Sequence, residues 1–300
     1  MQEIRIGTRG SDLALWQANF IKNQLESITK FPVILKIIKT RGDKITNLSF
    51  SKMEGKGFFT KELEETLLNN DIDLAVHSLK DLQTVMPEGL ALTAVGFRED
   101  NREALLIRKE SFSPDNPLKI KSGGIIGSSS VRRLCQISNI QPDLQMKDLR
   151  GNVPTRVGKL RERKYDAIII AYAGIKRLEL NLSDLHLELL DEDFFLPAPA
   201  QGILGLQTRA NDSPVIDIVS QLDDKTARIQ IDLERGLMKL MEGGCQLPLG
   251  AFSRIEGDNY RLCAVYGLKE NHKWIGLKRA DVMGNDIAEM IEEAYRQLKA

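Results

Sequence analysis

Short apolar segments alternate with helical patterns along much of the chain, and this alternation sets the class of fold. The first block has apolar segments at 4–7, 33–38 and 72–76, separated by helical patterns at 11–29 and 58–70. A second block has apolar segments near 103–108, 124–127, 144–148 and 166–171. Strand–helix alternation of this kind builds α/β sheets. We therefore expect two consecutive α/β domains.

Three short motifs of the first block recur in the same order in the second. The pairs are residues 6–11 with 126–133, 40–43 with 149–152, and 73–81 with 166–174. Self-similarity in a fixed order indicates a repeated architecture, so the two domains are expected to share one plan. In an open α/β sheet, ligands bind where parallel strands end and helix N-termini present free N–H groups. Two such edges facing each other would form an anion-binding cleft.

The composition limits the kind of partner. The 300 residues include 42 Lys and Arg against 42 Asp and Glu, so no overall field attracts nucleic acid or an anionic membrane. No apolar run approaches the roughly 20 residues of a transmembrane helix, and the N-terminus lacks the pattern of a secretion signal. We expect a cytoplasmic protein without nucleic-acid or membrane partners. Any anion is then bound by a local cluster of side chains.

The pattern changes after residue 219. A helical pattern at 224–241 precedes strand-like runs at 248–255, 260–268 and 273–281, and an amphipathic helix begins at about 284. Closely spaced runs joined by turns predict a small antiparallel sheet. Pro and Gly in 196–202 are typical of a hinge or crossing segment. The predicted domains are 1–97 with 197–218, 98–196, and 219–300.

Basic and hydroxyl side chains cluster in or just after the predicted strand-to-helix turns. They are Arg9, Ser11, Lys52, Lys56, Lys80, Arg132, Arg133, Arg150 and Arg156. A guanidinium binds a carboxylate through two parallel hydrogen bonds, and a hydroxyl at a helix start adds a donor. A single arginine is most often a solvated surface charge. The clustering favours instead a ligand that carries several carboxylates.

The segment from His77 to Asp81 directly follows an apolar strand. At the carboxyl edge of the sheet, Asp81 could act as a general acid or base or stabilise a cation, with Lys80 influencing its pKa. Alternatively, Asp81 only complements a helix dipole and His77 is a hydrogen-bonded core histidine. A thiol hydrolase built from His77, Asp81 and Cys245 is a further alternative, which the spacing does not support.

The three cysteines have neither paired spacing nor metal-ligand spacing with the three histidines, so we expect reduced thiols and no metal site. Cys245 stands on a Gly-Gly turn three residues before Pro248, which predicts display on a loop. An accessible thiolate there can form a thioether with an electrophile. Cys135 and Cys263 are expected to be small buried hydrophobes.

Two glycines surround Lys56 just before an aromatic pair at 58–59. No Gly-Lys-Ser/Thr sequence follows, so this is not a nucleotide-binding P-loop. The segment is either a lid over a site or an ordinary loop.

Ten motifs occur in one order along the chain, at 8–18, 40–43, 55–57, 61–64, 76–81, 98–100, 129–133, 149–153, 201–202 and 242–248. Each is weak by itself, but the ordered set is specific. In this combination the sequence resembles the porphobilinogen deaminase family over essentially the whole chain. It departs from the family pattern at Gln83, where proline is frequent, and this difference leaves the chemistry of Asp81 intact.

The resemblance implies two α/β domains like type 2 periplasmic binding proteins around a cleft, plus a C-terminal α+β domain with a three-stranded antiparallel sheet. It also implies a monomeric transferase that carries a dipyrromethane cofactor as a thioether on Cys245. Such an enzyme condenses four porphobilinogens with loss of ammonia and releases hydroxymethylbilane by hydrolysis. The family's catalytic aspartate matches Asp81, which would stabilise positive charge developing on pyrrole nitrogens.

The resemblance also assigns binding roles. Each porphobilinogen carries an acetate and a propionate, which accounts for the many basic residues. The cofactor carboxylates are assigned to Ser11, Lys80, Ser130, Arg132 and Arg133. The substrate or growing chain is assigned to Arg9, Gln17, Arg150 and Arg156. Lys52 and Lys56 would belong to the lid, with Phe59 covering the cofactor ring.

A hypothesis from a different class is a non-catalytic two-domain binding protein for a small carboxylate. A third domain with a displayed thiol argues against it.

Overall fold

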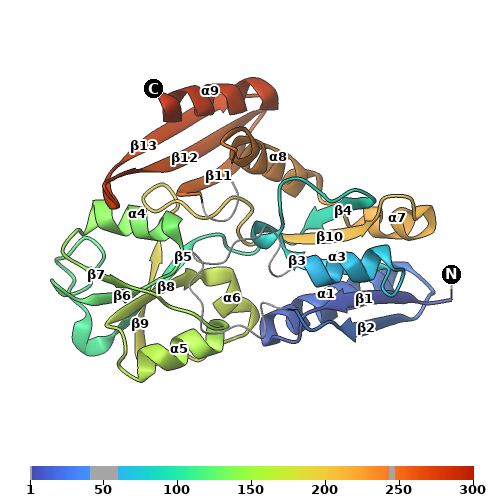
Figure 1. Ribbon diagram of the computed structural model, residues 1–300, viewed down its shortest axis with the longest axis horizontal. Coiled ribbons are helices and arrows are strands. Elements are labelled where there is room, and N and C mark those ends of the chain that lie inside the picture. The colour runs from blue at the N-terminus through green and yellow to red at the C-terminus, as the bar shows by residue number, and fades with distance from the viewer. Residues whose placement is uncertain (1, 41–59, 243–246) are drawn as a thin grey trace. The chain divides into compact units, whose positions relative to one another are not determined.

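The computed structural model describes residues 2–40, 60–242 and 247–300. In this part of the chain the strands form three sheets, and the chain divides into two compact units (Figure 1). Unit 1 comprises Met1–Glu99 with Gln201–Ile229, and unit 2 comprises Asp100–Ala200 with Gln230–Ala300. Unit 2 holds two of the three sheets, and the division of the chain into three domains stays a prediction.

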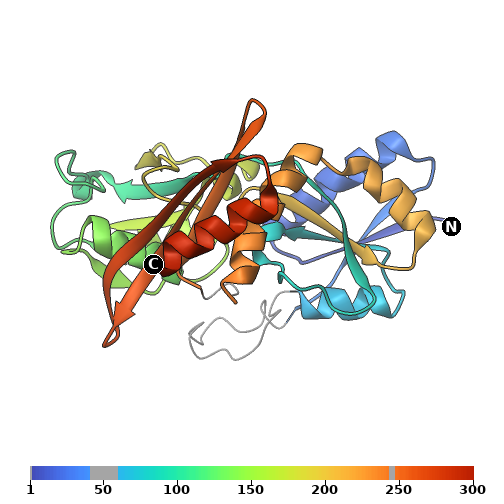
Figure 2. The ribbon, with the colours of Figure 1, turned by 90° about the horizontal axis from the view of Figure 1, so that it is seen from above.

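Unit 1 is built around a five-stranded sheet. Its strands are β1 (Ile4–Thr8), β2 (Val33–Ile37), β3 (Leu74–Ser78), β4 (Leu90–Gly96) and β10 (Leu204–Arg209), in the order β2-β1-β3-β10-β4. Its helices are α1 (Asp12–Ile28), α3 (Lys61–Leu68) and α7 (Ser213–Val219), with 3-10 turns η2 (Leu79–Asp81) and η4 (Ser220–Leu222). Ile21 and Leu25, four residues apart on α1, pack with Ile4 and Ile6 of β1. Helix α3 covers the opposite face of the sheet, where Leu63 is buried (Figure 2).

Unit 2 contains a second five-stranded sheet. Its strands are β5 (Glu103–Arg108), β6 (Ile125–Gly127), β7 (Gln145–Lys147), β8 (Ala167–Ala171) and β9 (Leu185–Leu190), in the order β7-β6-β8-β5-β9. The helices beside it are α4 (Val131–Ile140), α5 (Val153–Arg161) and α6 (Tyr172–Arg177), with the 3-10 turn η3 (Lys109–Ser111). Side chains of β5 and β8 belong to two apolar clusters, one on each face of the sheet.

The two five-stranded sheets share one plan. In each, three parallel strands are followed by one antiparallel strand, β10 in unit 1 and β5 in unit 2. Each antiparallel strand follows a point where the chain passes from one unit to the other: β5 follows the passage into unit 2, and β10 follows the return to unit 1. The chain leaves unit 1 after Glu99 and returns to it at Gln201. These two places are in contact, since the Glu99 N–H donates to the Gly202 carbonyl at 3.0 Å. Gly202 has φ +88°, and a Cβ there would lie 2.2 Å from the Glu99 carbonyl oxygen, so the close approach requires glycine.

The third sheet lies in the C-terminal part of unit 2. It is antiparallel, with β11 (Leu249–Glu256), β12 (Asn259–Glu270) and β13 (Lys273–Gly284), and is accompanied by α8 (Lys225–Leu240) and α9 (Ile287–Lys299). Helix α9 begins after Asp286, whose side chain accepts from the Glu289 N–H. Helix α4 of the second sheet also packs on β12 and β13.

The predicted fold class is confirmed: two α/β sheets of like plan and a C-terminal three-stranded antiparallel sheet. The sequence patterns missed three strands, β4, β9 and β10. Two of these, β4 and β9, are edge strands that follow the antiparallel insertion, and β10 directly follows the Pro- and Gly-rich crossing segment.

Candidate active site

Asp81 ends the short turn that follows β3. Strand β3 is buried over Leu74, Ala75 and Val76, as expected for a central strand. The turn is held by Leu79, whose side chain is buried and whose N–H donates to the Ile203 carbonyl at 3.0 Å. Asp81 itself is exposed at the carboxyl edge of the parallel strands. A ligand at this edge can therefore reach its carboxylate.

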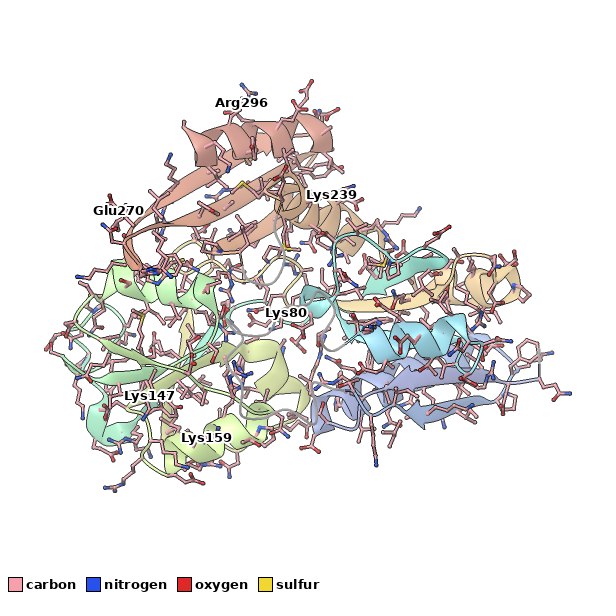
Figure 3. All side chains as sticks on the ribbon, viewed as in Figure 1. Lys80, Lys147, Lys159, Lys239, Glu270 and Arg296 are labelled. Carbon is pink, nitrogen blue, oxygen red and sulfur yellow. The ribbon has the colours of Figure 1, made fainter. Side chains whose placement is uncertain are left out.

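Lys80, labelled in Figure 3, precedes Asp81 on the same turn. It is half-buried, and its Nζ donates to Oε1 of Gln201 at 3.2 Å. Gln201 is fully buried just ahead of β10. The ammonium group is thus oriented by a residue that enters the sheet from the crossing segment.

The end of β1 brings the other predicted residues of unit 1 to the same edge. Arg9 follows the strand, and Ser11 is the N-cap of α1, where its side chain makes no capping bond within the described part of the chain. Gln17 is buried, and its Nε2 donates to the Ser78 hydroxyl at 2.8 Å. Because Ser78 is the last residue of β3, this bond joins α1 to the strand that leads into the turn of Asp81.

In unit 2, Arg132 and Arg133 lie on the first turn of α4, whose N-cap is Ser130. Both are buried, and both bind the carboxylate of Glu103, which is 0% exposed. The distances are 2.5 Å from Arg132 Nη2 to Oε1 and 2.7 Å from Arg133 Nη2 to Oε2. Burial lowers the pKa of Arg132, and the neighbouring Glu103 carboxylate opposes that shift.

Counted over its three residues, the Glu103–Arg132–Arg133 cluster has a formal charge of one positive, because two guanidinium groups face one carboxylate. In addition, Nε of Arg133 is buried without a hydrogen-bond partner among residues 2–40, 60–242 and 247–300. A buried net charge and an unused donor are both costly unless an anion compensates them. The donor set therefore fits the carboxylates of an acidic ligand such as dipyrromethane.

Arg150 and Arg156 follow the end of β7, near the start of α5. Asn152 caps the helix by accepting from the Thr155 N–H at 2.9 Å. Arg156 Nε donates to the Gly151 carbonyl at 2.7 Å, and Lys159 Nζ donates to the Arg150 carbonyl at 2.9 Å. Both predicted arginines are half-buried in a turn that these bonds hold in place.

The structure thus brings the predicted residues together as two sets, one in each unit. Unit 1 holds Arg9, Ser11, Gln17, Lys80 and Asp81 at one sheet edge, and unit 2 holds Ser130, Arg132, Arg133, Arg150 and Arg156 at the other. Four predicted residues, Lys52, Lys56, Phe59 and Cys245, lie outside the described residues.

Two contributors were missed at the sequence level: Glu103 and Gln201. Glu103 begins a strand whose next four residues are fully buried, and a carboxylate beside such a run signals a buried partner. Gln201 lies in the crossing segment, and no local sequence pattern indicates its bond to Lys80.

His77 is hydrogen-bonded in the core, as one of the alternatives proposed. Its Nε2 lies 3.0 Å from Oε1 of Gln207. Burial lowers the pKa of His77 to about 4, against the effect of this hydrogen bond. The imidazole is therefore neutral near pH 7, and its partner is Gln207 rather than a catalytic group.

Cys135 and Cys263 are free and buried, as expected. Among the residues that the structure describes, no group of three or more His, Cys, Asp or Glu side chains could hold a metal ion. No helix in the same ranges has the length and apolar character needed to cross a membrane.

Two sheets of one plan, each with basic and hydroxyl side chains where its parallel strands end, define a class: α/β proteins whose ligand-binding edges suit anions. Among solved structures, the chain is similar to the Bordetella pertussis BvgS periplasmic VFT2 domain, with a TM-score of 0.43, 12% identity and coverage of 74% of this chain and 86% of that one.

Comparison with protein families narrows the class. Residues 4–217 match the model "Porphobilinogen deaminase, dipyromethane cofactor binding domain", and residues 229–293 match "Porphobilinogen deaminase, C-terminal domain". The chain is 41% identical to the porphobilinogen deaminase of Campylobacter concisus (strain 13826) over 306 residues, covering 99% of this chain and 97% of the relative. It is 45% identical to that of Trichlorobacter lovleyi over 264 residues, covering 87% and 82%. The chain belongs to the porphobilinogen deaminase family, whose members are transferases with a dipyrromethane cofactor.

Proposed function

We propose that this chain condenses four porphobilinogen molecules, with loss of ammonia, onto a covalently bound dipyrromethane and releases hydroxymethylbilane by hydrolysis. The observation that carries the proposal is the buried Glu103–Arg132–Arg133 cluster with its net positive charge at a ligand-binding edge. Pyrroles that each bear two carboxylates can supply the anions that form hydrogen bonds with such a cluster.

Asp81 is the catalytic residue in this proposal. Joining an aminomethyl carbon to a pyrrole carbon places positive charge on pyrrole nitrogens. A fixed carboxylate near those nitrogens stabilises the transition state more than the ground state, which is the requirement for catalysis. The short turn that carries Asp81 supports this role, because the buried Leu79 holds it in place.

Cys245 anchors the dipyrromethane as a thioether, and when bound this group supplies the pyrrole carbon to which the first substrate is joined. Its carboxylates are held by Ser11, Lys80, Ser130, Arg132 and Arg133. The incoming substrate and the growing chain are held by Arg9, Gln17, Arg150 and Arg156. Lys52, Lys56 and Phe59 form the lid. The enzyme works as a cytoplasmic monomer, with porphobilinogen as its partner and neither nucleic acid nor membrane.

The test of this function is the intact mass of the purified protein. We expect a mass above that of the polypeptide by one dipyrromethane, and a positive colour reaction with Ehrlich's reagent, which detects reactive pyrroles. A fully active protein at the unmodified mass would refute the covalent cofactor. An unmodified, inactive protein that binds small carboxylates would instead support the two-domain binding protein.

A further inference from the structure

The antiparallel strand of each five-stranded sheet starts where the parallel strands end. Glu103, the first residue of β5, pairs with Ala171, the last residue of β8. Leu204, the first residue of β10, pairs with Ser78, the last residue of β3. The chain therefore delivers the start of each antiparallel strand directly to the ligand-binding edge.

Both of these entry points supply a buried partner for a basic residue. In unit 1, Gln201 accepts from Lys80. In unit 2, Glu103 accepts from Arg132 and Arg133 at once, one guanidinium on each carboxylate oxygen. In both units, therefore, a buried side chain at the start of the antiparallel strand accepts a hydrogen bond from a basic residue. The interaction is stronger in unit 2 because the acceptor there is a carboxylate rather than an amide.

The two guanidinium groups are held at a second point each. Arg132 Nη1 donates to the Leu196 carbonyl at 2.7 Å, and Arg133 Nη1 donates to the Ile169 carbonyl at 3.0 Å. Each arginine is fixed between a carboxylate and a backbone carbonyl, which leaves its planar group no freedom to turn. Without Glu103, two buried cations would stand side by side with only carbonyl oxygens to balance them.

A buried ion cluster of this kind is poorly explained by stability. Apolar side chains of equal volume often stabilise a protein as well as or better than a buried ion pair. A cluster that holds one net positive charge and an unused Nε–H is better explained by ligand binding.

We propose that Glu103 is a positioning residue for the cofactor: it orients Arg132 and Arg133 toward the ligand carboxylates and cancels one of their two charges. This inference rests on the proposed function and adds to it a residue that does not itself touch the ligand. Displacement of a positioning group by about 1 Å can slow a reaction by about 10²-fold, so loss of Glu103 should slow the assembly of the dipyrromethane on the protein and lower the fraction that carries it.

The test compares Glu103→Gln with Glu188→Gln as a control. Glu188 lies on β9 of the same sheet and pairs with the surface residue Lys119 at 2.6 Å. The readout is the fraction of folded protein that carries the adduct, measured by intact mass after size-exclusion chromatography. We expect a reduction of about tenfold for Glu103→Gln and none for Glu188→Gln. Because only folded protein is counted, a purely structural role would leave this fraction unchanged.

Glu103→Asp keeps the charge but shortens the side chain by one methylene, so it serves as the second variant. We expect its adduct fraction to lie between those of Glu103→Gln and the unchanged protein. If Glu103→Gln yields no folded protein, an unchanged adduct fraction in Glu103→Asp overturns the proposal. So does an unchanged fraction in folded Glu103→Gln. Absence of the adduct from the unchanged protein would instead overturn the proposed function.

Discussion

At the scale of single residues, the predicted site residues of the two units differ in burial. Asp81 is exposed on a turn whose backbone is pinned by Leu79, whereas Arg132 and Arg133 are buried and already bonded. In the proposed function, this difference suits an acid that meets each new substrate and two arginines that hold a ligand that stays bound.

Replacement of Asp81 tests the catalytic assignment. Asp81→Asn keeps the size of the side chain but removes the charge that stabilises the transition state, so we expect turnover to fall by about 10²–10³-fold. The adduct should still form, as seen by intact mass. Glu88→Gln, an exposed acid close by in the chain, is the control and should keep its activity. Near-normal turnover in Asp81→Asn would remove Asp81 from its role.

His77 leads to a prediction about pH. The folded protein lowers the His77 pKa to about 4, whereas an unfolded chain binds this proton near pH 6.5. Between these values the unfolded state binds more protons, so stability falls as pH falls. Urea unfolding at pH 7 and pH 5 should show a loss that is about 2 kcal/mol smaller in His77→Gln than in the unchanged protein. Equal losses in both proteins would show that His77 is not the group that titrates.

Some residue roles could be predicted from the sequence and others could not. The burial of Cys135 and Cys263 follows from residue type, and the position of Asp81 at the end of β3 follows from the apolar strand before it, whereas its catalytic role stays a prediction from the family resemblance. The pairing of Glu103 with Arg132 and Arg133 joins residues about 30 positions apart. Only the strand order brings them together, and that order is not a local property.

At the scale of elements, the internal repeat has a physical basis. Asp73 and Asp166 stand just before the third parallel strand of their sheets, and each accepts from a backbone N–H of the first strand at 2.9 Å, from Arg5 and Ile125 respectively. Each also binds cationic side chains, among them Arg209 in unit 1 and Arg108 in unit 2. One carboxylate therefore joins neighbouring parallel strands in each sheet, at the end opposite the predicted ligand-binding edge.

Asp166→Asn should weaken the sheet of unit 2. Burial raises the pKa of Asp166, but hydrogen bonds from Ile125, Lys121 and Ser111 outweigh it and hold the pKa far below the usual range. We expect a loss of about 2 kcal/mol in unfolding free energy at pH 7. Because the folded pKa is lowered, this contribution is present above the unfolded pKa of about 4 and fades as pH falls below it.

Chemical denaturation at pH 7 and pH 3 measures the Asp166 effect. Asp184→Asn is the control, because Asp184 forms an exposed pair with Arg161 that should contribute under about 1 kcal/mol. An equal loss at both pH values would contradict the role of the ionised carboxylate.

Strand prediction succeeded where periodicity was strong and failed at inserted strands. The three long C-terminal strands and their turns were predicted close to their observed bounds. By contrast, β10 follows a segment whose sequence predicts a hinge, since Gly202 and two prolines precede the strand. Its partners β3 and β4 lie more than 100 residues earlier in the chain, so no local sequence pattern indicates that they pair with β10.

At the scale of the whole molecule, unit 2 joins two sheets through one helix. Helix α4 carries Ser130, Arg132 and Arg133 at its start, and its Cys135 packs against Gly267 of β12. The Gly267 N–H donates to the Pro248 carbonyl at 3.0 Å, three residues after Cys245 in the sequence. Helix α4 and strand β12 therefore share a packed contact next to Pro248, which leads into β11.

Gly267→Ala tests whether this contact makes unit 2 cooperative. A Cβ at Gly267 would lie 2.6 Å from Cys135 Cβ and 2.7 Å from its Sγ, so the helix or the sheet must shift. We expect a loss of about 1–3 kcal/mol in stability. Gly276→Ala on β13 is the control, because nothing lies within 4 Å of a Cβ there.

Hydrogen exchange followed by mass spectrometry should show faster exchange in α4 and in β11, β12 and β13 together, with β1 and β3 unchanged. Faster exchange in the C-terminal strands with α4 unaffected would mean that the two sheets of unit 2 unfold independently.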